Sequence, residues 1–251
     1  MIILKLIGQL FGRVQGKANM KIIAVVPAYN EEKTIFKVVS ELKENVKEVI
    51  AVDDGSNDQT AELAKKAGAK ILTHFLNRGQ GAALQTGIFC ALKDGADIIV
   101  TFDADAQHNP EEIDRVVEPL LLSEVDVVLG SRFLKSEIRS ASWRTKSEIP
   151  LSRIIILKLA SWFTRLYTGL AVTDTHNGFR AISAKAASLI EIKQDGMAHA
   201  SEIIEQIKKH NLKFKEVPVA INYTKHSLAK GQKLSNSFKI IWDLIISRIA
   251  K

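Results

Sequence analysis

The sequence is poor in cysteine and has no long apolar run. Its 251 residues include a single cysteine, Cys90, which excludes an intramolecular disulfide and a cysteine zinc cluster. No run approaches the roughly 18 apolar residues of a membrane-spanning helix, and the first residues lack the layout of a signal peptide. We therefore expect a protein of the reducing cytoplasm that does not cross a membrane.

Low-complexity segments and internal repeats are also lacking. With 46% hydrophobic and 25% charged residues, the composition is that of a globular protein, and the length suits one catalytic domain. The net charge of +7 favours an anionic partner, such as a nucleotide, a phosphorylated lipid or an acidic membrane surface. Nucleic acid is not an expected partner, because the basic residues form no known reading motif.

Apolar strand-like runs alternate with helical patterns from residue 21 onward. The runs occupy residues 22–26, 48–52, 69–73, 98–102 and 126–129, and the helical patterns between them begin at residues 31, 58, 80 and 110. This rhythm predicts an α/β fold with a doubly wound, mostly parallel sheet flanked by helices. The polar segments PAYNE, DDGS, DADAQ and GSR each follow a strand, so we expect one binding edge at the carboxyl ends of the strands.

The segment VTFDADAQHNP carries the strongest chemical signal. Period-two geometry at a strand end points Asp103 and Asp105 the same way, with Gln107 next in the series. Carboxylate and amide oxygens that converge suit Mg²⁺ or Mn²⁺, whose remaining positions a substrate diphosphate fills. We expect His108 to support the Asp105 loop and Asn109 to cap the following helix. The alternative is a solvated capping loop, which needs no pair of aspartates.

Two other strand ends carry candidate nucleotide contacts. Tyr29 has a ring that can pack on a base, and Glu31 can accept hydrogen bonds from ribose or base. We interpret Asp53 or Asp54 as base-binding and Asp58 as a helix cap.

Arginines supply the candidate phosphate contacts. Gly79 and Gly81 form a glycine-rich turn before a helix, for which close packing is as good an explanation as a phosphate cradle. Arg78, beside this turn, is expected to face the nucleotide. Arg132 follows one strand and Arg180 precedes another, so both can reach phosphate oxygens through the forked donors of guanidinium.

The second half is expected to hold the acceptor. Asp174 and Glu202 are the candidate bases for a hydroxyl acceptor, although Glu202 opens a helix and can equally be a cap. Lys225, Lys230 and Lys233 form a basic segment that either closes over a diphosphate or is a solvated loop.

Three amphipathic segments frame this organisation. Helical spacing of apolar residues predicts an N-terminal amphipathic extension at residues 1–19, a long helix at 151–168 and a C-terminal amphipathic helix at 238–251. Residues 1–19 are equally well explained as an upstream extension before a second possible start at Met20. A mixture of apolar, aromatic and basic residues suits a membrane interface. Core packing would explain one such helix, but three such segments in a basic protein favour membrane contact. We expect the catalytic domain to span residues 20–237, with a nucleotide half at 20–132 and an acceptor half at 133–237.

The motifs PAYNE, DDGSNDQT, RGQGAA, DADAQH, GSRF, DTHNGFRA and EVPV followed by KGQK occur in one order. In that order the chain resembles the family 2 glycosyltransferases of the GT-A fold, and most of all the polyprenyl-phosphate (dolichyl-phosphate) glycosyltransferases. The resemblance implies metal ligands at Asp103, Asp105 and Gln107. It implies nucleotide contacts at Pro27, Tyr29, Glu31 and Asp54, to which we add Asp53, Arg78, Asp103 and Ala104. It implies phosphate and acceptor contacts at Arg132, Arg180, Lys233, Arg153 and Lys158, to which we add Asp174 and Glu202.

The resemblance also implies an activity. We expect an inverting, metal-dependent enzyme that moves a sugar from a GDP- or UDP-sugar to a polyprenyl phosphate, while peripherally associated with the cytoplasmic membrane face. Asp105, Arg132, Arg180 and Lys233 are the expected catalytic residues. The chain departs from the family at Asn177, where serine is usual before GFR, and at Lys158, where arginine is common. The alternatives are transfer to a saccharide or small-molecule hydroxyl, and a non-catalytic sugar-nucleotide-binding protein.

Overall fold

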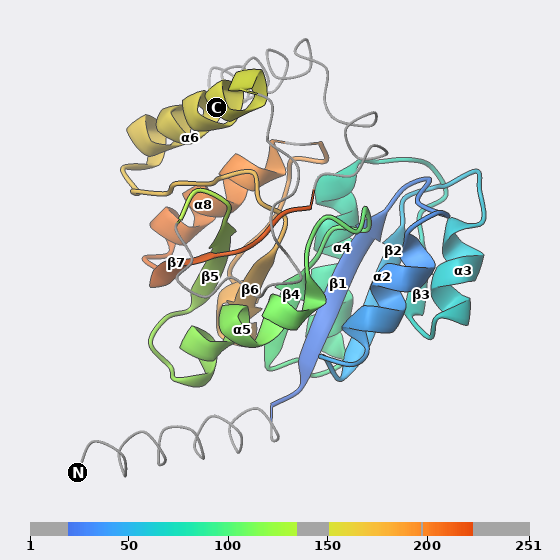
Figure 1. The fold of residues 1–251 in the computed structure, drawn as a ribbon. Helices are drawn as coiled ribbons and strands as arrows, with labels where there is room; N and C mark the ends of the chain where they lie inside the picture. Colours follow the sequence, from blue (N-terminus) through green and yellow to red (C-terminus); the bar gives the residue numbers. More distant parts are fainter. Residues whose placement is uncertain (1–19, 135–150, 197, 223–251) are drawn as a thin grey trace.

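A seven-stranded sheet forms the centre of the molecule (Figure 1). The computed structural model describes residues 20–134, 151–196 and 198–222. The strands lie in the order β3-β2-β1-β4-β6-β5-β7. Their bounds are β1 Ile22–Ala28, β2 Glu48–Asp53, β3 Lys70–Thr73, β4 Ile98–Thr101, β5 Val127–Ser131, β6 Arg180–Ser183 and β7 Phe214–Pro218.

Helices cover both faces of the sheet, so the fold has three layers. One apolar core cluster joins the sheet to α2 (Ile35–Leu42), α3 (Thr60–Lys66) and α5 (Ile113–Leu121). A second cluster joins the opposite face to α4 (Gln80–Lys93), α7 (Ala184–Ala187) and α8 (His199–Lys209). Helix α6 (Leu151–Thr168) packs on α8 and lies outside these layers (Figure 1). The predicted mostly parallel, doubly wound α/β fold is confirmed.

Strand β6 is the exception to the parallel sheet. It is inserted between β4 and β5 and runs antiparallel to both, an arrangement that the sequence rhythm did not predict. Because of this direction, Arg180 at the start of β6 pairs with Thr101 at the end of β4. The loop that precedes β6 therefore meets the segment that follows β4, and the two motifs DTHNGFR and DADAQ come together at one edge.

Several element boundaries differ from the predicted ones. Helix α2 begins at Ile35 and not at residue 31, and residues 32–34 form a turn before it. The N–H groups of Asn30, Glu31 and Glu32 donate to side chains of the 56–60 loop. Helix α3 begins at Thr60, whose N–H donates to Asp58 as the cap prediction requires. At residue 110 a 3-10 turn precedes α5, and Asn109 caps it as predicted.

Strand β4 ends at Thr101, one residue before the end of the predicted run. No helix in the described ranges has the length and apolarity to span a bilayer. The expected amphipathic segments 1–19 and 238–251, and the basic residues 225, 230 and 233, lie outside the described residues.

Candidate functional site

The acidic motif lies at the carboxyl edge of the sheet, immediately after β4. Both oxygens of the Asp103 carboxylate have partners: Gln80 Nε2 donates to Oδ1 at 3.0 Å, and His108 Nε2 lies 3.2 Å from Oδ2. Burial acts to raise the pKa of Asp103, but the hydrogen bond with His108 and the neighbouring positive charges, including that of Arg180, together outweigh it, so the pKa is lowered. Asp103 is therefore ionised at neutral pH. The hydrogen-bonded partner of His108 is Asp103, at the start of the loop that carries Asp105, and its charge also acts on Asp105.

Asp105 lies in a turn, because the chain leaves the strand conformation after Thr101 and Ala106 adopts a φ of 59°. We had expected strand periodicity to set the direction of the two carboxylates, and it does not. They are nevertheless close enough to interact. Burial, and next the negative charge of Asp103, raise the pKa of Asp105 to about 6. Two carboxylates share a partly buried site in which their mutual repulsion is not neutralised.

This pair fits a hard divalent cation. Mg²⁺ is commonly held by one or two carboxylates with substrate phosphates in the other positions, and the described residues include no group of three or more His, Cys, Asp or Glu side chains placed for a metal. Gln107 donates hydrogen bonds to Asp105 through both its backbone N–H and its side-chain amide. Its amide nitrogen, not its oxygen, faces Asp105, so a ligand role for Gln107 requires the amide to rotate.

Gly178 and Arg180 connect the acidic motif to the loop before β6. A Cβ at Gly178 would lie 2.2 Å from Asp103 Oδ2, so only glycine leaves room for the carboxylate there. The Arg180 guanidinium is fully enclosed, and Nη2 donates to Thr175 O at 3.2 Å. Burial lowers its pKa to about 10, whereas the charges of Asp103 and Asp174 act to raise it. Within the part of the chain that the structure describes, Nη1 is buried and has no hydrogen-bond partner, so this cation has a donor to offer to an anion.

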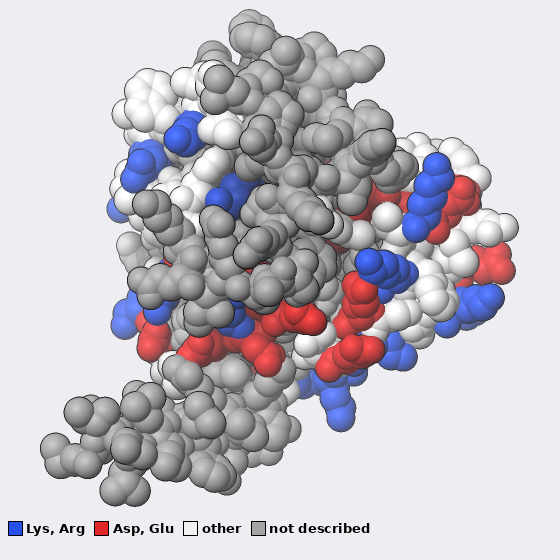
Figure 2. All heavy atoms as spheres, viewed as in Figure 1, with Lys and Arg blue, Asp and Glu red and all other residues white. Residues whose placement is uncertain are grey.

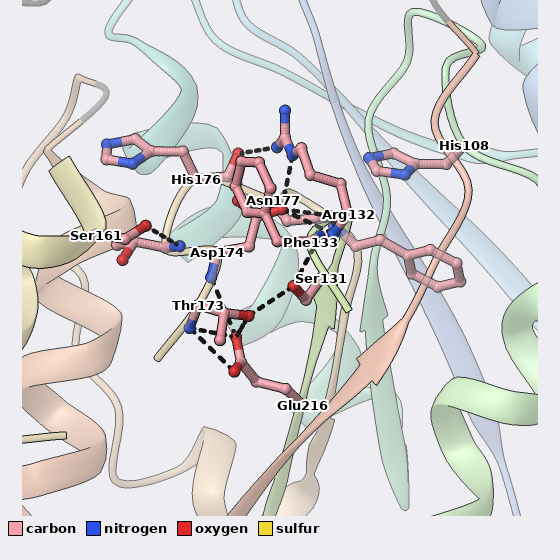
Figure 3. Close-up of polar contacts among 12 residues, drawn as sticks. His108, Ser131, Arg132, Phe133, Ser161, Thr173, Asp174, His176, Asn177 and Glu216 are labelled. Carbon is pink, nitrogen blue, oxygen red and sulfur yellow. Dashed lines mark hydrogen bonds and ion pairs between the residues drawn. The ribbon is translucent and has the colours of Figure 1, made fainter. Parts of the chain in front are cut away.

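Arg132 and Asp174 form the second charged pair of the site (Figure 3). Arg132 donates to Asp174 Oδ2 from its backbone N–H at 3.0 Å and from Nε at 2.6 Å, and its Nη2 donates to His176 O at 3.1 Å. Both side chains are largely buried, at 9% and 1% exposure. Burial lowers the pKa of His176 to about 4, so this imidazole is neutral at pH 7.

Glu216 on β7 holds the turn that carries Asp174, a role that no pattern in the sequence predicts. Its carboxylate accepts the N–H and the hydroxyl of Thr173 and the N–H of Asp174. The Thr173 hydroxyl also lies 2.7 Å from the Ser131 hydroxyl, which accepts the N–H of Phe133. Figure 3 shows Glu216, Thr173 and Ser131 at the base of the Arg132 network.

On the predicted donor side, Asp54 is occupied by contacts within the chain. It lies 2.7 Å from His74 Nδ1 and accepts the N–H groups of Arg78 and Gly79. His74 continues the network to the Thr86 hydroxyl at 3.0 Å. Asp54 therefore fixes the turn before α4, whose first residue, Gln80, holds Asp103.

The neighbouring predicted contacts differ in exposure. Tyr29 is 42% exposed, whereas Pro27, Ala104 and Asp53 are buried, and Asp53 accepts the N–H of Ser56 at 3.3 Å. Glu31 accepts the Thr34 hydroxyl at 3.2 Å, and its charge contributes to the raised pKa of Asp105. The nucleotide candidates thus line the same edge as the acidic pair.

The glycine-rich turn is explained by packing. A Cβ at Gly79 would lie 2.3 Å from Asp195 O, and one at Gly81 would lie 1.9 Å from Gln194 O. Glu202 holds the same loop, because it accepts the N–H groups of Lys193 and Gln194. The side chain of Arg78 is 59% exposed and lies 3.6 Å from Asp195.

Of the remaining acceptor candidates, the structure describes the side chain of Lys158 alone. Lys158 is exposed on α6, with Nζ 6.0 Å from the centre of the Phe133 ring. Lys233 lies outside the described residues, as does the side chain of Arg153.

Known proteins resemble this chain along most of its length. "Uncharacterized protein MJ1222" of Methanocaldococcus jannaschii is 43% identical over 233 residues, which cover 91% of this chain and 93% of the relative. "UDP-N-acetylglucosamine--dolichyl-phosphate N-acetylglucosaminyltransferase" of Methanococcus voltae is 33% identical over 254 residues, 93% of this chain and 98% of the relative. "Undecaprenyl-phosphate mannosyltransferase" of Micrococcus luteus is 30% identical over 210 residues, 80% of this chain and 83% of the relative.

Solved structures share the fold. Glucosyl-3-phosphoglycerate synthase from Mycobacterium tuberculosis, in complex with Mn²⁺ and UDP-glucose, superposes with a TM-score of 0.70 at 20% identity, over 95% of this chain and 81% of that one. At that identity the likeness concerns the fold alone. The family described as "Glycosyl transferase family 2" matches residues 23–188, which include the acidic motif and the strands β1 to β6 except for Ile22, the first residue of β1. This chain belongs to glycosyl transferase family 2.

Proposed function

We propose that this glycosyltransferase moves a sugar from a nucleotide-diphosphate sugar to a polyprenyl phosphate, with inversion, a divalent cation and peripheral attachment to the cytoplasmic face of a membrane. One observation carries the proposal: two buried arginines, Arg132 and Arg180, converge on the loop that packs against the Asp103 carboxylate. Two positive groups beside one acidic pair suit a reaction in which both the leaving group and the acceptor are phosphates.

On the donor side, Asp103 and Asp105 hold the cation, with Gln107 as a third ligand after rotation of its amide. The cation supplies positive charge to the diphosphate leaving group. Gln80 and His108 fix the orientation of Asp103, which keeps the carboxylate in place before the donor binds. Tyr29, Glu31 and the Asp53–Asp54 segment lie along the edge available to the nucleoside.

On the acceptor side, the site needs no strong base. A phosphate monoester is already anionic near neutral pH, so its oxygen attacks without losing a proton. The candidate bases for a hydroxyl acceptor have other partners, since Asp174 holds Arg132 and Glu202 holds the 193–194 turn. This favours a phosphate acceptor over a saccharide hydroxyl, and the name of the Methanococcus voltae relative, which includes dolichyl phosphate, supports it.

Helix α6 supports contact with a membrane, because its polar side is buried and its apolar side is exposed. Ser161, Thr164 and Thr168 are 5%, 1% and 7% exposed, and the Ser161 hydroxyl accepts the N–H of Thr175 in the acceptor loop. The opposite side carries an apolar stripe with exposures of 51%, 55%, 58% and 65%, formed by Ile155, Leu159, Trp162 and Leu166.

The charge around this stripe has one sign. Lys158 and Arg165 are exposed on α6, and the helix contains no acidic residue. Figure 2 shows Lys and Arg among uncharged residues where Figure 1 places α6, and the acidic residues of this view lie elsewhere. An apolar stripe flanked by cations suits the headgroup region of an anionic bilayer.

The transfer proposal is tested with a panel of GDP- and UDP-sugars, a short polyprenyl phosphate, and Mn²⁺ or EDTA, with mass spectrometry of the lipid. We expect one donor to give a glycolipid in Mn²⁺ and none in EDTA. Asp105→Asn should abolish the product, whereas Asp94→Asn, which breaks a pair with Lys70 outside the site, should retain it. A glycolipid formed equally well in EDTA would contradict the metal assignment.

The membrane proposal is tested by sedimentation with vesicles of neutral and of anionic lipid. We expect binding that requires anionic lipid, and a large loss of binding in a Trp162→Ser/Leu166→Ser variant. Phe36→Ser, which removes a 43% exposed apolar side chain from α2, is the matched control and should bind as the native protein does. Equal sedimentation of both variants would contradict a docking role for α6.

A further inference from the structure

Glu216 is a carboxylate near the Arg132–Asp174 pair that has no role in the proposed reaction. Its Oε1 accepts the N–H of Thr173 at 2.8 Å, the Thr173 hydroxyl at 2.9 Å and the N–H of Asp174 at 3.1 Å, and its Oε2 accepts the N–H of Thr173 at 3.0 Å. Glu216 lies on β7, 43 residues along the chain from Thr173. One side chain thus fixes two consecutive N–H groups of a turn that is remote in sequence.

This turn carries the carboxylate to which Arg132 donates. The residue that follows Thr173 is Asp174, whose Oδ2 accepts both the backbone N–H and Nε–H of Arg132. A second connection runs through the Thr173 hydroxyl to Ser131, the residue immediately before Arg132. Glu216 is therefore linked to Arg132 by two indirect routes, one through Asp174 and one through the Thr173 and Ser131 hydroxyls, and makes no direct contact with it (Figure 3).

We propose that Glu216 is a positioning residue that holds the 173–174 turn so that Arg132 presents its guanidinium to the acceptor phosphate. This inference rests on the proposed function for the identity of the acceptor, but not for the position of Arg132. Without Glu216, the N–H groups of Thr173 and Asp174 lose their acceptor, and the turn has no other described partner for them. The Asp174 carboxylate then no longer has a fixed position from which to orient Arg132.

A first experiment measures the position of Arg132 without any substrate. The Nε–H of Arg132 gives a resonance in a ¹⁵N–¹H spectrum that an Arg132→Lys variant identifies, and its hydrogen bond to Asp174 slows its exchange with water. We expect Glu216→Ala to shift this resonance and to accelerate its exchange at least about 10-fold. Glu216→Gln should largely restore it, because the amide oxygen replaces Oε1 and accepts three of the four hydrogen bonds.

The matched control is Asp126→Asn. Asp126 accepts the N–H of Lys213 at 2.9 Å just before β7 begins, at the opposite edge of the sheet, and therefore also fixes backbone that adjoins β7. It should leave the Arg132 resonance unchanged. If Glu216→Ala does not fold, Thr173→Val removes the two hydroxyl contacts alone, with Thr173→Ser as its control.

A second experiment measures transfer. We expect Glu216→Ala to raise the KM for the polyprenyl phosphate about 10-fold and to leave the KM for the nucleotide sugar unchanged. In an Arg132→Ala background the same substitution should have no further effect, because Glu216 acts through Arg132.

The outcomes separate the two claims. An unchanged Arg132 resonance in folded Glu216→Ala or Thr173→Val, or additive effects in the Arg132→Ala background, would overturn the positioning role. A native protein that makes no glycolipid would overturn the proposed function, and the resonance would still decide the role of Glu216.

Discussion

Asp105 in the metal-free protein should be a destabilising charge, which leads to an uncommon mutational result. Burial and the Asp103 charge raise its pKa from the ordinary value of 3.8 to about 6. The native state therefore binds a proton more tightly than the unfolded state, so stability is lost as the pH rises from about 4 through about 6. At about 1.36 kcal/mol per pKa unit, the loss at neutral pH is about 3 kcal/mol.

Asp105→Asn removes this charge and leaves an oxygen for the N–H of Gln107. In EDTA at pH 7.5 we expect the variant to be more stable than the native protein by up to about 3 kcal/mol, or about 6–12 °C in Tm for a chain of this size. At pH 5 the difference should shrink, because native Asp105 is then largely protonated. Added Mn²⁺ should raise the Tm of the native protein and not that of the variant, since only the native site keeps both carboxylates.

The assay is urea and thermal unfolding at the two pH values, with EDTA or Mn²⁺. Asp58→Asn is the control of opposite sign: burial acts to raise the pKa of Asp58, but hydrogen bonds from Thr60 and Glu32 outweigh it and lower the pKa. That variant should be less stable at pH 7.5. An Asp105→Asn protein that is equally or less stable than the native one in EDTA at pH 7.5 would refute the reasoning.

Three further substitutions test the packing of the site. Gly178→Ala places a Cβ 2.2 Å from Asp103 Oδ2. In a Mn²⁺ titration of donor hydrolysis, we expect the Mn²⁺ concentration for half-maximal activity to rise at least about 10-fold. Arg180→Met leaves the two aspartates that it faces without its charge, and should lower the free energy of unfolding in urea by about 3–5 kcal/mol; an unchanged midpoint would show that the charge is not needed there. Gly81→Ala meets Gln194 O at 1.9 Å, and should lower the Tm through a cost of about 1–3 kcal/mol without changing the activity of the folded fraction.

Local periodicity predicted much of the fold because the signals lie within short windows. Helix α6 has the predicted bounds, the strand runs lie within a few residues of the observed strands, and Asn109 caps the turn after the acidic motif. The four polar segments that follow strands gather at one edge, since parallel strands end together. These features depend on side-chain alternation and capping chemistry that neighbouring residues specify.

The features that the sequence did not predict depend on contacts between distant residues. The antiparallel insertion of β6 depends on its pairing with β4, about 80 residues away. Glu216 reaches Thr173 over 43 residues. The segment before α2 is likewise held by distant residues, because side chains of the 56–60 loop accept the N–H groups of residues 30–32. No local pattern specifies such partners.

Arg180 links the two halves of the site. It is enclosed between the acidic motif and the 174–178 loop, and both Asp103 and Asp174 act on its charge. A change of charge at the proposed metal site therefore changes the electrostatic potential at the group that we propose receives phosphate, without any movement of the backbone. The proposed donor and acceptor sites share one buried cation.

The identity of the acceptor is the central claim, and a direct competition tests it. The enzyme, Mn²⁺ and one labelled nucleotide sugar are given equal amounts of a short polyprenyl phosphate and of soluble hydroxyl acceptors, including 3-phosphoglycerate and free sugars. Mass spectrometry then follows the label into each product. The account predicts labelled glycolipid and no labelled soluble glycoside; label in a soluble glycoside, with none in the lipid, would contradict it.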